Sequence, residues 1–181
     1  MKQLFEGKNS RTRFQRGFTL VELLVVIVIL AALSFLLILL INPVEQTKKS
    51  RDAIRLSDIS SVSRAVGIAI DVAGEPNAAL LCVNTPSPCT GLSNSGVTDP
   101  GKSDGSGWVK VKLDSVAGAN FPKLPIDPMN IGNYHYRYYS NGSDFEVGVV
   151  FESEAFRSKM EEDGGNNAQI YELGTNLKLV N

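Results

Sequence analysis

Apolar residues form one long block near the start of the chain. From Phe18 to Ile41 the sequence reads FTLVELLVVIVILAALSFLLILLI, in which only Thr19, Glu22 and Ser34 are polar. As an α-helix this block spans about 36 Å, enough to cross a hydrocarbon core of about 30 Å. It is longer than the apolar core of a secretory signal peptide, about 7–15 residues, and it lacks the polar face of a soluble helix. The pattern therefore predicts one membrane-spanning helix.

A second helical pattern follows, with its apolar residues on one side only. Beyond Pro43, apolar side chains recur at helical spacing at Ile59, Val62, Val66, Ala69, Ile70 and Ala73. Charged residues are expected mostly away from this face, at Arg51, Arg55, Asp58 and Arg64. The spacing predicts an amphipathic helix that ends before Gly74. Because proline lacks an amide hydrogen and disfavours helix in the preceding residue, any break in the combined helix 18–73 is expected at Asn42 and Pro43.

The rest of the chain, residues 74–181, has the signals of a β-rich domain. Residues 74–107 are rich in proline and glycine and predict a long loop. Strands are expected at residues 108–113, 134–138 and 145–151, with a hairpin turn at Asn141-Gly142. A short helix and a last hairpin are expected at residues 153–162, 169–173 and 177–180. A helix laid across an antiparallel sheet is the economical packing, so the sequence predicts an α+β fold.

Charge and cysteine usage bear on partners and compartment. Residues 1–17 carry five Lys and Arg against one acid, whereas residues 18–181 carry thirteen against eighteen. An acidic body without a basic patch disfavours nucleic-acid binding through phosphates. Basic residues on both sides of the apolar block nearly balance, so charge alone does not orient the helix. Cys82 and Cys89 lie in the Pro- and Gly-rich stretch and suit a disulfide formed outside the cytosol, which places the C-terminal part outside.

Few residues suggest catalysis. The single histidine, His135, lies in an alternating segment, and the sequence holds no recognisable carboxylate pair, nucleophile–base pair or phosphate loop, so no enzyme is expected. Glu22 is the residue that needs an explanation. An ionised carboxylate costs about 2.5–3.5 kcal/mol at mid-membrane. Glu22 therefore lies either close to the headgroups or beside a cation.

The stretch Arg16-Gly17-Phe18-Thr19-Leu20-Val21-Glu22, followed by the apolar run, resembles the class III signal of type IV pilins and of type II secretion pseudopilins. The resemblance implies that residues 1–17 are a basic leader. A prepilin peptidase would cleave between Gly17 and Phe18, and Phe18 would then be N-methylated. It also implies that Glu22 pairs with the Phe18 amine of a neighbouring subunit. The fold of the family is a long N-terminal helix, with a transmembrane half and an amphipathic half, packed on a C-terminal antiparallel sheet.

The resemblance implies a structural subunit, a pilin, of an extracellular type IV pilus. Its precursor would span the cytoplasmic membrane once, with its N-terminus in the cytoplasm, and then join copies of itself at a pilus assembly platform. Residues 18–41 would form the filament core, and residues 74–181 the extracellular domain. Two alternatives stay open: a pseudopilin of a type II secretion system, and a monomeric single-pass membrane protein that displays a small binding domain.

One further segment bears on metal binding. Residues 124–130, LPIDPMN, resemble the Pro-x-Asp-Pro stretch of major pseudopilins, in which a nearby acidic loop binds calcium. The later Asp- and Gly-rich part of that loop is not recognisable in this sequence. We therefore expect no cofactor, with calcium as the alternative and Asp127, Asn130 and Asp144 as its candidate ligands.

Overall fold

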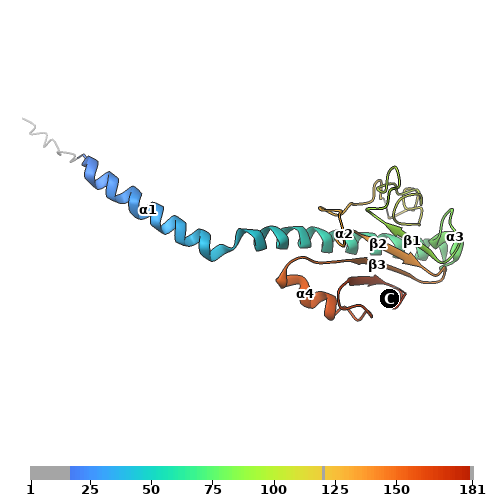
Figure 1. Cartoon of the computed structure of the whole chain (residues 1–181). Helices are drawn as coiled ribbons and strands as arrows, with labels where there is room; N and C mark the ends of the chain where they lie inside the picture. The colour runs from blue at the N-terminus through green and yellow to red at the C-terminus, as the bar shows by residue number, and fades with distance from the viewer. Residues whose placement is uncertain (1–16, 120, 180–181) are drawn as a thin grey trace, which may run out of the picture. The chain divides into compact units, whose positions relative to one another are not determined.

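The computed structural model describes residues 17–119 and 121–179, so most of the leader expected at residues 1–17 lies outside the described residues. The chain divides into two units, residues 1–42 and residues 43–181. The described part of the first unit consists mainly of helix α1 (Leu20–Ile41) (Figure 1). Its segment Leu20–Ile38 is the one helix among the described residues that is long and apolar enough to cross a membrane, and none of that segment is buried.

The backbone breaks between α1 and the next helix, α2 (Pro43–Ala73). Asn42 has φ 46° and ψ 78°, the left-handed conformation that asparagine adopts more readily than most residues. Pro43 then starts α2, where its missing amide hydrogen costs no helical hydrogen bond. The residues 18–73 expected as one combined helix therefore form two helices. At the far end, Gly74 has φ 87°, a backbone conformation that stops α2 at Ala73.

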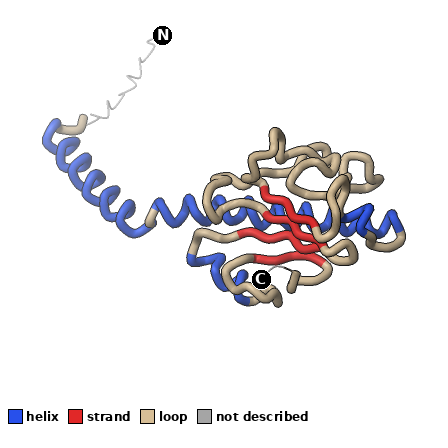
Figure 2. Tube along the Cα trace, turned by 45° about the vertical axis from the view of Figure 1, so that its right-hand side comes forward, coloured by secondary structure: helices blue, strands red, loops and turns tan. Residues whose placement is uncertain are grey.

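The second unit is a four-stranded antiparallel sheet packed on α2. Its further elements are α3 (Ala78–Leu81), β1 (Cys89–Leu92), β2 (Arg137–Ser140), β3 (Phe145–Val149), α4 (Glu154–Glu161) and β4 (Tyr171–Gly174). The strands lie in the order β1-β2-β3-β4, and Figures 1 and 2 show them laid across α2. The expected α+β fold, an N-terminal apolar helix followed by a C-terminal antiparallel sheet, is confirmed.

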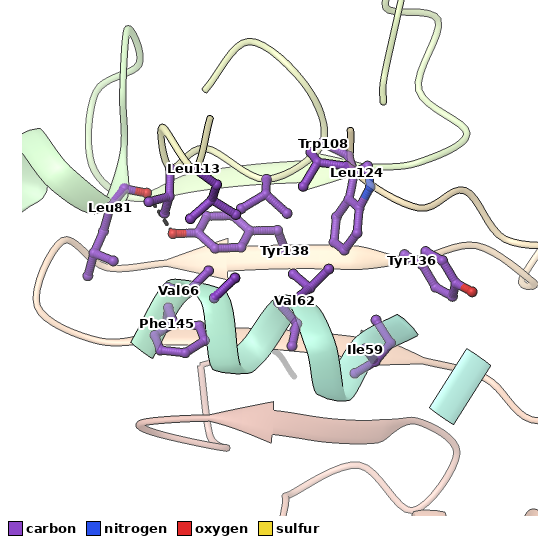
Figure 3. Close-up of a cluster of buried hydrophobic side chains, with 14 of the residues drawn as sticks. Ile59, Val62, Val66, Leu81, Trp108, Leu113, Leu124, Tyr136, Tyr138 and Phe145 are labelled. Atoms are coloured by element: carbon purple, nitrogen blue, oxygen red, sulfur yellow. Dashed lines mark hydrogen bonds between the residues drawn. The ribbon is translucent and has the colours of Figure 1, made fainter. Parts of the chain in front are cut away.

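The core lies between α2, the sheet and the long segment before β2. Ile59, Val62 and Val66 of α2 are fully buried and lie beside Tyr138 and Phe145 of the strands (Figure 3). Each such aliphatic side chain contributes about 1.5–3 kcal/mol on burial. The Tyr138 hydroxyl donates to the backbone oxygen of Leu81 at 2.7 Å, which joins the sheet to α3. The expected apolar face of α2 is buried at Ile59, Val62, Val66 and Ala69, but Ala73 at its end is exposed.

Several sequence expectations about the second unit are wrong, the first of them the strand at residues 108–113. Residues 108–113 form no regular strand: Trp108, Val109, Val111 and Leu113 are all buried, so their pattern reflects packing and not a ladder. Their amides bond to scattered partners, for example Trp108 N–H to Pro100 O at 2.9 Å and Leu113 N–H to Ser103 O at 2.7 Å. Lys110 donates from Nζ to Gly107 O at 2.8 Å.

Residues 74–107 are not a loop throughout, because α3 and β1 lie within them. The last hairpin is also absent from the described residues: β4 pairs with β3, and residues 177–179 form no strand. The expected strand at 134–138 begins only at Arg137. By contrast, the turn at Asn141-Gly142 joins β2 to β3 as expected, and α4 forms within the expected range 153–162.

Candidate functional site

Gly17 and Phe18, between which cleavage is expected, lie outside regular structure. Both residues precede the first turn of α1, and Phe18 is 85% exposed. A Cβ added at Gly17 would meet no atom within 4 Å. An exposed peptide bond outside regular structure is the form that a protease cleft can accept. The processing role of Gly17 and Phe18 therefore stays a prediction with a suitable local geometry.

Thr19 and Glu22 close the first turn of α1 by a reciprocal capping box. The Thr19 amide and hydroxyl each donate to Oε2 of Glu22 at 2.8 Å, and the Glu22 amide donates to the Thr19 hydroxyl at 3.2 Å. The box satisfies amide groups that a helix start otherwise leaves unpaired. Within the described residues, no hydrogen bond reaches Oε1 of Glu22, and no cation pairs with this carboxylate. Glu22 therefore caps the start of α1 through Oε2, while its Oε1 is still able to accept a hydrogen bond.

Beyond this cap, the described side chains of α1 have no covering partner within the first unit. Every residue from Gly17 to Ile38 is exposed, and the branched and aromatic side chains among them include Leu20, Val25, Ile29, Leu33, Phe35 and Ile38. So large an apolar surface is stable only in lipid or against other apolar helices. The surface is therefore suited either to membrane insertion or to helix packing.

The second unit holds a buried ionic group that the sequence did not indicate. We call it the arginine cluster: Arg51, Asp52, Arg55, Asp127 and Glu152. Arg55, expected away from the apolar face, is fully buried, as is Asp52. Arg55 Nε donates to Asp127 Oδ2 at 2.6 Å and Nη2 to Oδ1 at 3.0 Å; Nη1 donates to Asp52 at 2.8 Å and also to Glu152. A usable signal existed, because Arg55 lies four residues before Ile59 on the same helical face.

Electrostatics explain how this charge is tolerated. Burial lowers the pKa of Arg55, but the hydrogen bonds to three carboxylates outweigh burial, so that the net shift is upward. Burial likewise raises the pKa of Asp127, and the bonds from Arg55 and from two backbone amides outweigh it, so that the net shift is downward. The Arg51 hydrogen bond is the main cause that lowers the pKa of Glu152. The hydrogen bonds of the cluster tie α2 to the segment around Asp127 and to residues 152 and 153, just before α4.

The candidate calcium ligands are not gathered into one site. Both oxygens of Asp127 bind Arg55, and Oδ1 also accepts from the amides of Met129 and Asn130. Asn130 Oδ1 accepts from Ser93 at 2.6 Å, near the start of β2. Asp144 lies in the turn at the opposite end of β2, where its backbone oxygen accepts from Ser140. Within the described residues, no group of three His, Cys, Asp or Glu is placed to hold a metal ion.

Cys82 and Cys89 form the expected disulfide, with Cα atoms 5.7 Å apart. Cys82 caps α3 and Cys89 begins β1, and both are buried in the core. The bridge therefore fastens the end of α3 to the edge of the sheet.

Comparison with known proteins matches one part of the chain. Residues 12–38 match the prokaryotic N-terminal methylation motif. This match covers the residues Arg16 to Glu22 and most of the apolar run, and it supports the class III signal that their resemblance implied. No curated protein and no solved structure matches the chain.

Proposed function

We propose that this chain, which carries the class III signal of type IV pilins and pseudopilins, is a structural subunit of an extracellular type IV pilus. Its precursor inserts into the cytoplasmic membrane through α1 and is cleaved between Gly17 and Phe18 by a prepilin peptidase. The processed chains then leave the bilayer and join one another through their α1 helices at an assembly platform.

One observation carries the proposal: the uncovered apolar helix α1 begins with a capped acidic residue directly after the processing motif. Cleavage would create a cationic amine at Phe18, one residue before the helix cap. The carboxylate of Glu22 uses Oε2 for its own cap. Its Oε1 can therefore accept the Phe18 amine of a neighbouring copy. Pairing neutralises two charges that would each cost several kcal/mol if left alone in an apolar core, so it fixes the axial register between subunits.

The choice of a pilus over a secretion pseudopilus rests on Asp127. In the pseudopilin alternative, the Pro-x-Asp-Pro segment belongs near a calcium site. Here the Asp127 carboxylate binds the guanidinium of Arg55 at two points, so an arginine already supplies the positive charge at this position. This arrangement supports a pilin whose domain is held together without the ion.

Surface fibres provide the test. Cells that express the chain with a prepilin peptidase would be sheared, and the fibre protein would be analysed by intact mass and N-terminal peptide mapping. We expect a chain that starts at N-methylated Phe18, in long fibres visible by electron microscopy. A fibre protein that starts at Met1 would overturn the processing step, and correctly processed protein that stays monomeric in the membrane would favour the single-pass alternative.

A second experiment distinguishes a pilus subunit from a pseudopilus subunit. Under native expression, a pilus subunit gives long surface fibres, whereas a pseudopilin gives none unless it is overproduced. If deletion of the gene abolishes protein export and the parent strain forms no surface fibres, the protein has the secretion role.

A further inference from the structure

A small polar hollow opens on the second unit, beside the C-terminal segment that precedes β4. It has a volume of about 230 Å³ and is lined by Asn133, Arg137, Val150, Asn167, Gln169 and Ile170. It adjoins a larger hollow of about 500 Å³, with which it shares Val150 and Gln169. Among the described residues, no acid lines the smaller hollow, and the one charged lining residue is Arg137.

Unlike Arg51 and Arg55, Arg137 has no carboxylate partner among the residues that the structure describes. It is half-buried at the start of β2, and within the described part of the chain it takes part in no salt bridge. Burial lowers its pKa, and no acidic group offsets that effect. A half-buried guanidinium without a counter-charge is costly, which makes an external anion a favourable partner.

The orientation of this guanidinium is fixed by the only histidine of the chain. Arg137 Nε donates to Nε2 of His135 at 3.1 Å, and His135 Nδ1 lies 2.8 Å from the backbone oxygen of Gly132. We assign the proton of the neutral imidazole to Nδ1, since Nε2 accepts from Arg137. With Nε engaged, the two Nη groups remain as a fork of donors, and no bond from either is found among residues 17–119 and 121–179.

Glu172, an acid on the same face of the sheet, does not fill this role. Register places Arg137 opposite Gly148 of β3 and Gly148 opposite Glu172 of β4, so the three share one face. The side chain of Ile170 covers Gly148: its Cγ2 lies 2.8 Å from where a Cβ on that glycine would be. Ile170 therefore separates Arg137 from Glu172, and these two charged residues do not form an ion pair.

The other lining groups complement an anion. Asn133, Asn167 and Gln169 also line the hollow, and among the described residues their side-chain NH2 groups donate no hydrogen bond, so they remain able to donate. One guanidinium carries one positive charge, which matches a carboxylate better than a doubly charged phosphate. A fork of two Nη donors also matches the two oxygens of a carboxylate in a bidentate arrangement.

We propose that the hollow around Arg137 is a carboxylate-binding site, in which the two Nη groups of Arg137 grip the carboxylate and the amides of Asn133, Asn167 and Gln169 line it. The carboxylate comes either from a free small acid or from an acidic side chain of another polypeptide. The site is independent of filament assembly, so it can be tested on the monomeric chain.

His135 supplies a direct spectroscopic readout. The chain has a single histidine, so its imidazole signals are unambiguous in an NMR spectrum of the full chain in detergent micelles. Titration with sodium acetate at constant ionic strength should shift these signals with half-saturation at millimolar concentration, the strength expected of one partly exposed fork. A bound anion should also raise the pKa of His135, which burial otherwise lowers. Sodium chloride should give no saturable shift.

Variants connect the signal to Arg137. Arg137→Gln should abolish the acetate response, and Arg137→Lys, which keeps the charge but lacks the fork, should weaken it about tenfold. Arg157→Gln is the matched control, because Arg157 lines only the adjoining hollow and should leave the response unchanged.

A second ligand distinguishes the two sources of the carboxylate. A capped tripeptide, acetyl-Gly-Glu-Gly-amide, that saturates the signal below the acetate concentration supports a protein partner, and the reverse order supports a free acid. If neither compound shifts the His135 signals in the parent chain, or if Arg137→Gln responds equally, the proposal is overturned.

Discussion

Arg55 of α2 and Asp127 are joined by a two-point salt bridge, with Nε to Oδ2 at 2.6 Å and Nη2 to Oδ1 at 3.0 Å, across 72 positions of sequence. Both side chains are fully buried. The same guanidinium binds Asp52 and Glu152, so one arginine fastens three separate segments of the second unit. Such a group stabilises the native arrangement mainly because each charge would be costly without the others.

Asp127→Asn should therefore strongly destabilise the second unit. The substitution keeps the size of the side chain but leaves Arg55 short of one of its carboxylates in a buried site. We expect the free energy of unfolding to fall by about 3–5 kcal/mol, the usual cost when one partner of a buried pair is removed. Urea unfolding of the full chain in micelles, followed by Trp108 fluorescence, measures it. Trp108 is fully buried and is the only tryptophan, so its emission reports the core.

The exposed pair Arg157–Glu154, 3.6 Å apart on α4, gives the control. Glu154→Gln should change the free energy of unfolding by less than about 0.5 kcal/mol, because exposed pairs contribute little. Equal effects of the two substitutions would mean that the arginine cluster is open to water.

The disulfide makes a smaller contribution to the free energy of unfolding, which can be measured separately. Cys82 and Cys89 are seven positions apart and close a ring of about eight residues, which by loop entropy stabilises the fold by about 2.5 kcal/mol. The double variant Cys82→Ala with Cys89→Ala should lose about this amount in the same urea experiment. The parent chain treated with a reductant should show the same loss, since its sulfur atoms remain in the core. A loss in the variant but not after reduction would assign the effect to packing.

The sequence predicted the features that depend on local pattern and missed those that depend on distant partners. The apolar length of α1, the buried stripe through Ile59 and Val62, and the turn at Asn141-Gly142 each follow from spacing within a few residues. The distant partners of Arg55 do not, because Asp127 and Glu152 lie 72 and 97 positions away in the sequence. The alternation of apolar and basic residues at 108–113 predicted a strand that does not form, for a related reason. A core can bury such a segment without any strand beside it.

The assembly role of Glu22 can be tested by a conservative substitution. Glu22→Gln keeps an acceptor oxygen that can still cap Thr19, but it removes the charge that pairs with an amine. We expect normal membrane insertion and cleavage, with surface fibres reduced at least about tenfold, because the Phe18 amine would enter the apolar core unpaired. Sheared fibres are quantified by immunoblot against total cell protein.

Ser34→Ala is the matched control for Glu22→Gln. Ser34 is the other polar side chain well inside α1, and its hydroxyl donates to Leu30 O at 2.8 Å within its own helix. Removing it should leave fibre yield unchanged. If Glu22→Gln assembles as well as the parent chain, pairing with the Phe18 amine is not the basis of register.

Glu146 of β3 and Glu172 of β4 are buried together on one face of the sheet, and Glu172 makes stability depend on pH. Oε1 of Glu172 has no hydrogen-bond donor among the described residues. Burial, together with the nearby Glu146 carboxyl, raises the pKa of Glu172 from its ordinary 4.5 to about 7. The folded state thus binds this proton more tightly than the unfolded state. Stability from this group is fully present below about pH 4.5 and is lost as the pH rises through 7.

Glu172→Gln, which mimics the protonated side chain, should remove this dependence. We expect the variant and the parent chain to be similarly stable near pH 4.5, and the variant to be more stable near pH 8 by on the order of 2 kcal/mol. The difference between the two proteins isolates Glu172 from Asp127 and Glu152, whose pKa values are lowered and which act at more acidic pH. Glu162→Gln, an exposed acid after α4, should give no such difference. Parallel stability curves for Glu172→Gln and the parent chain from pH 5 to 8 would show that the buried carboxyl is already ionised in the folded protein.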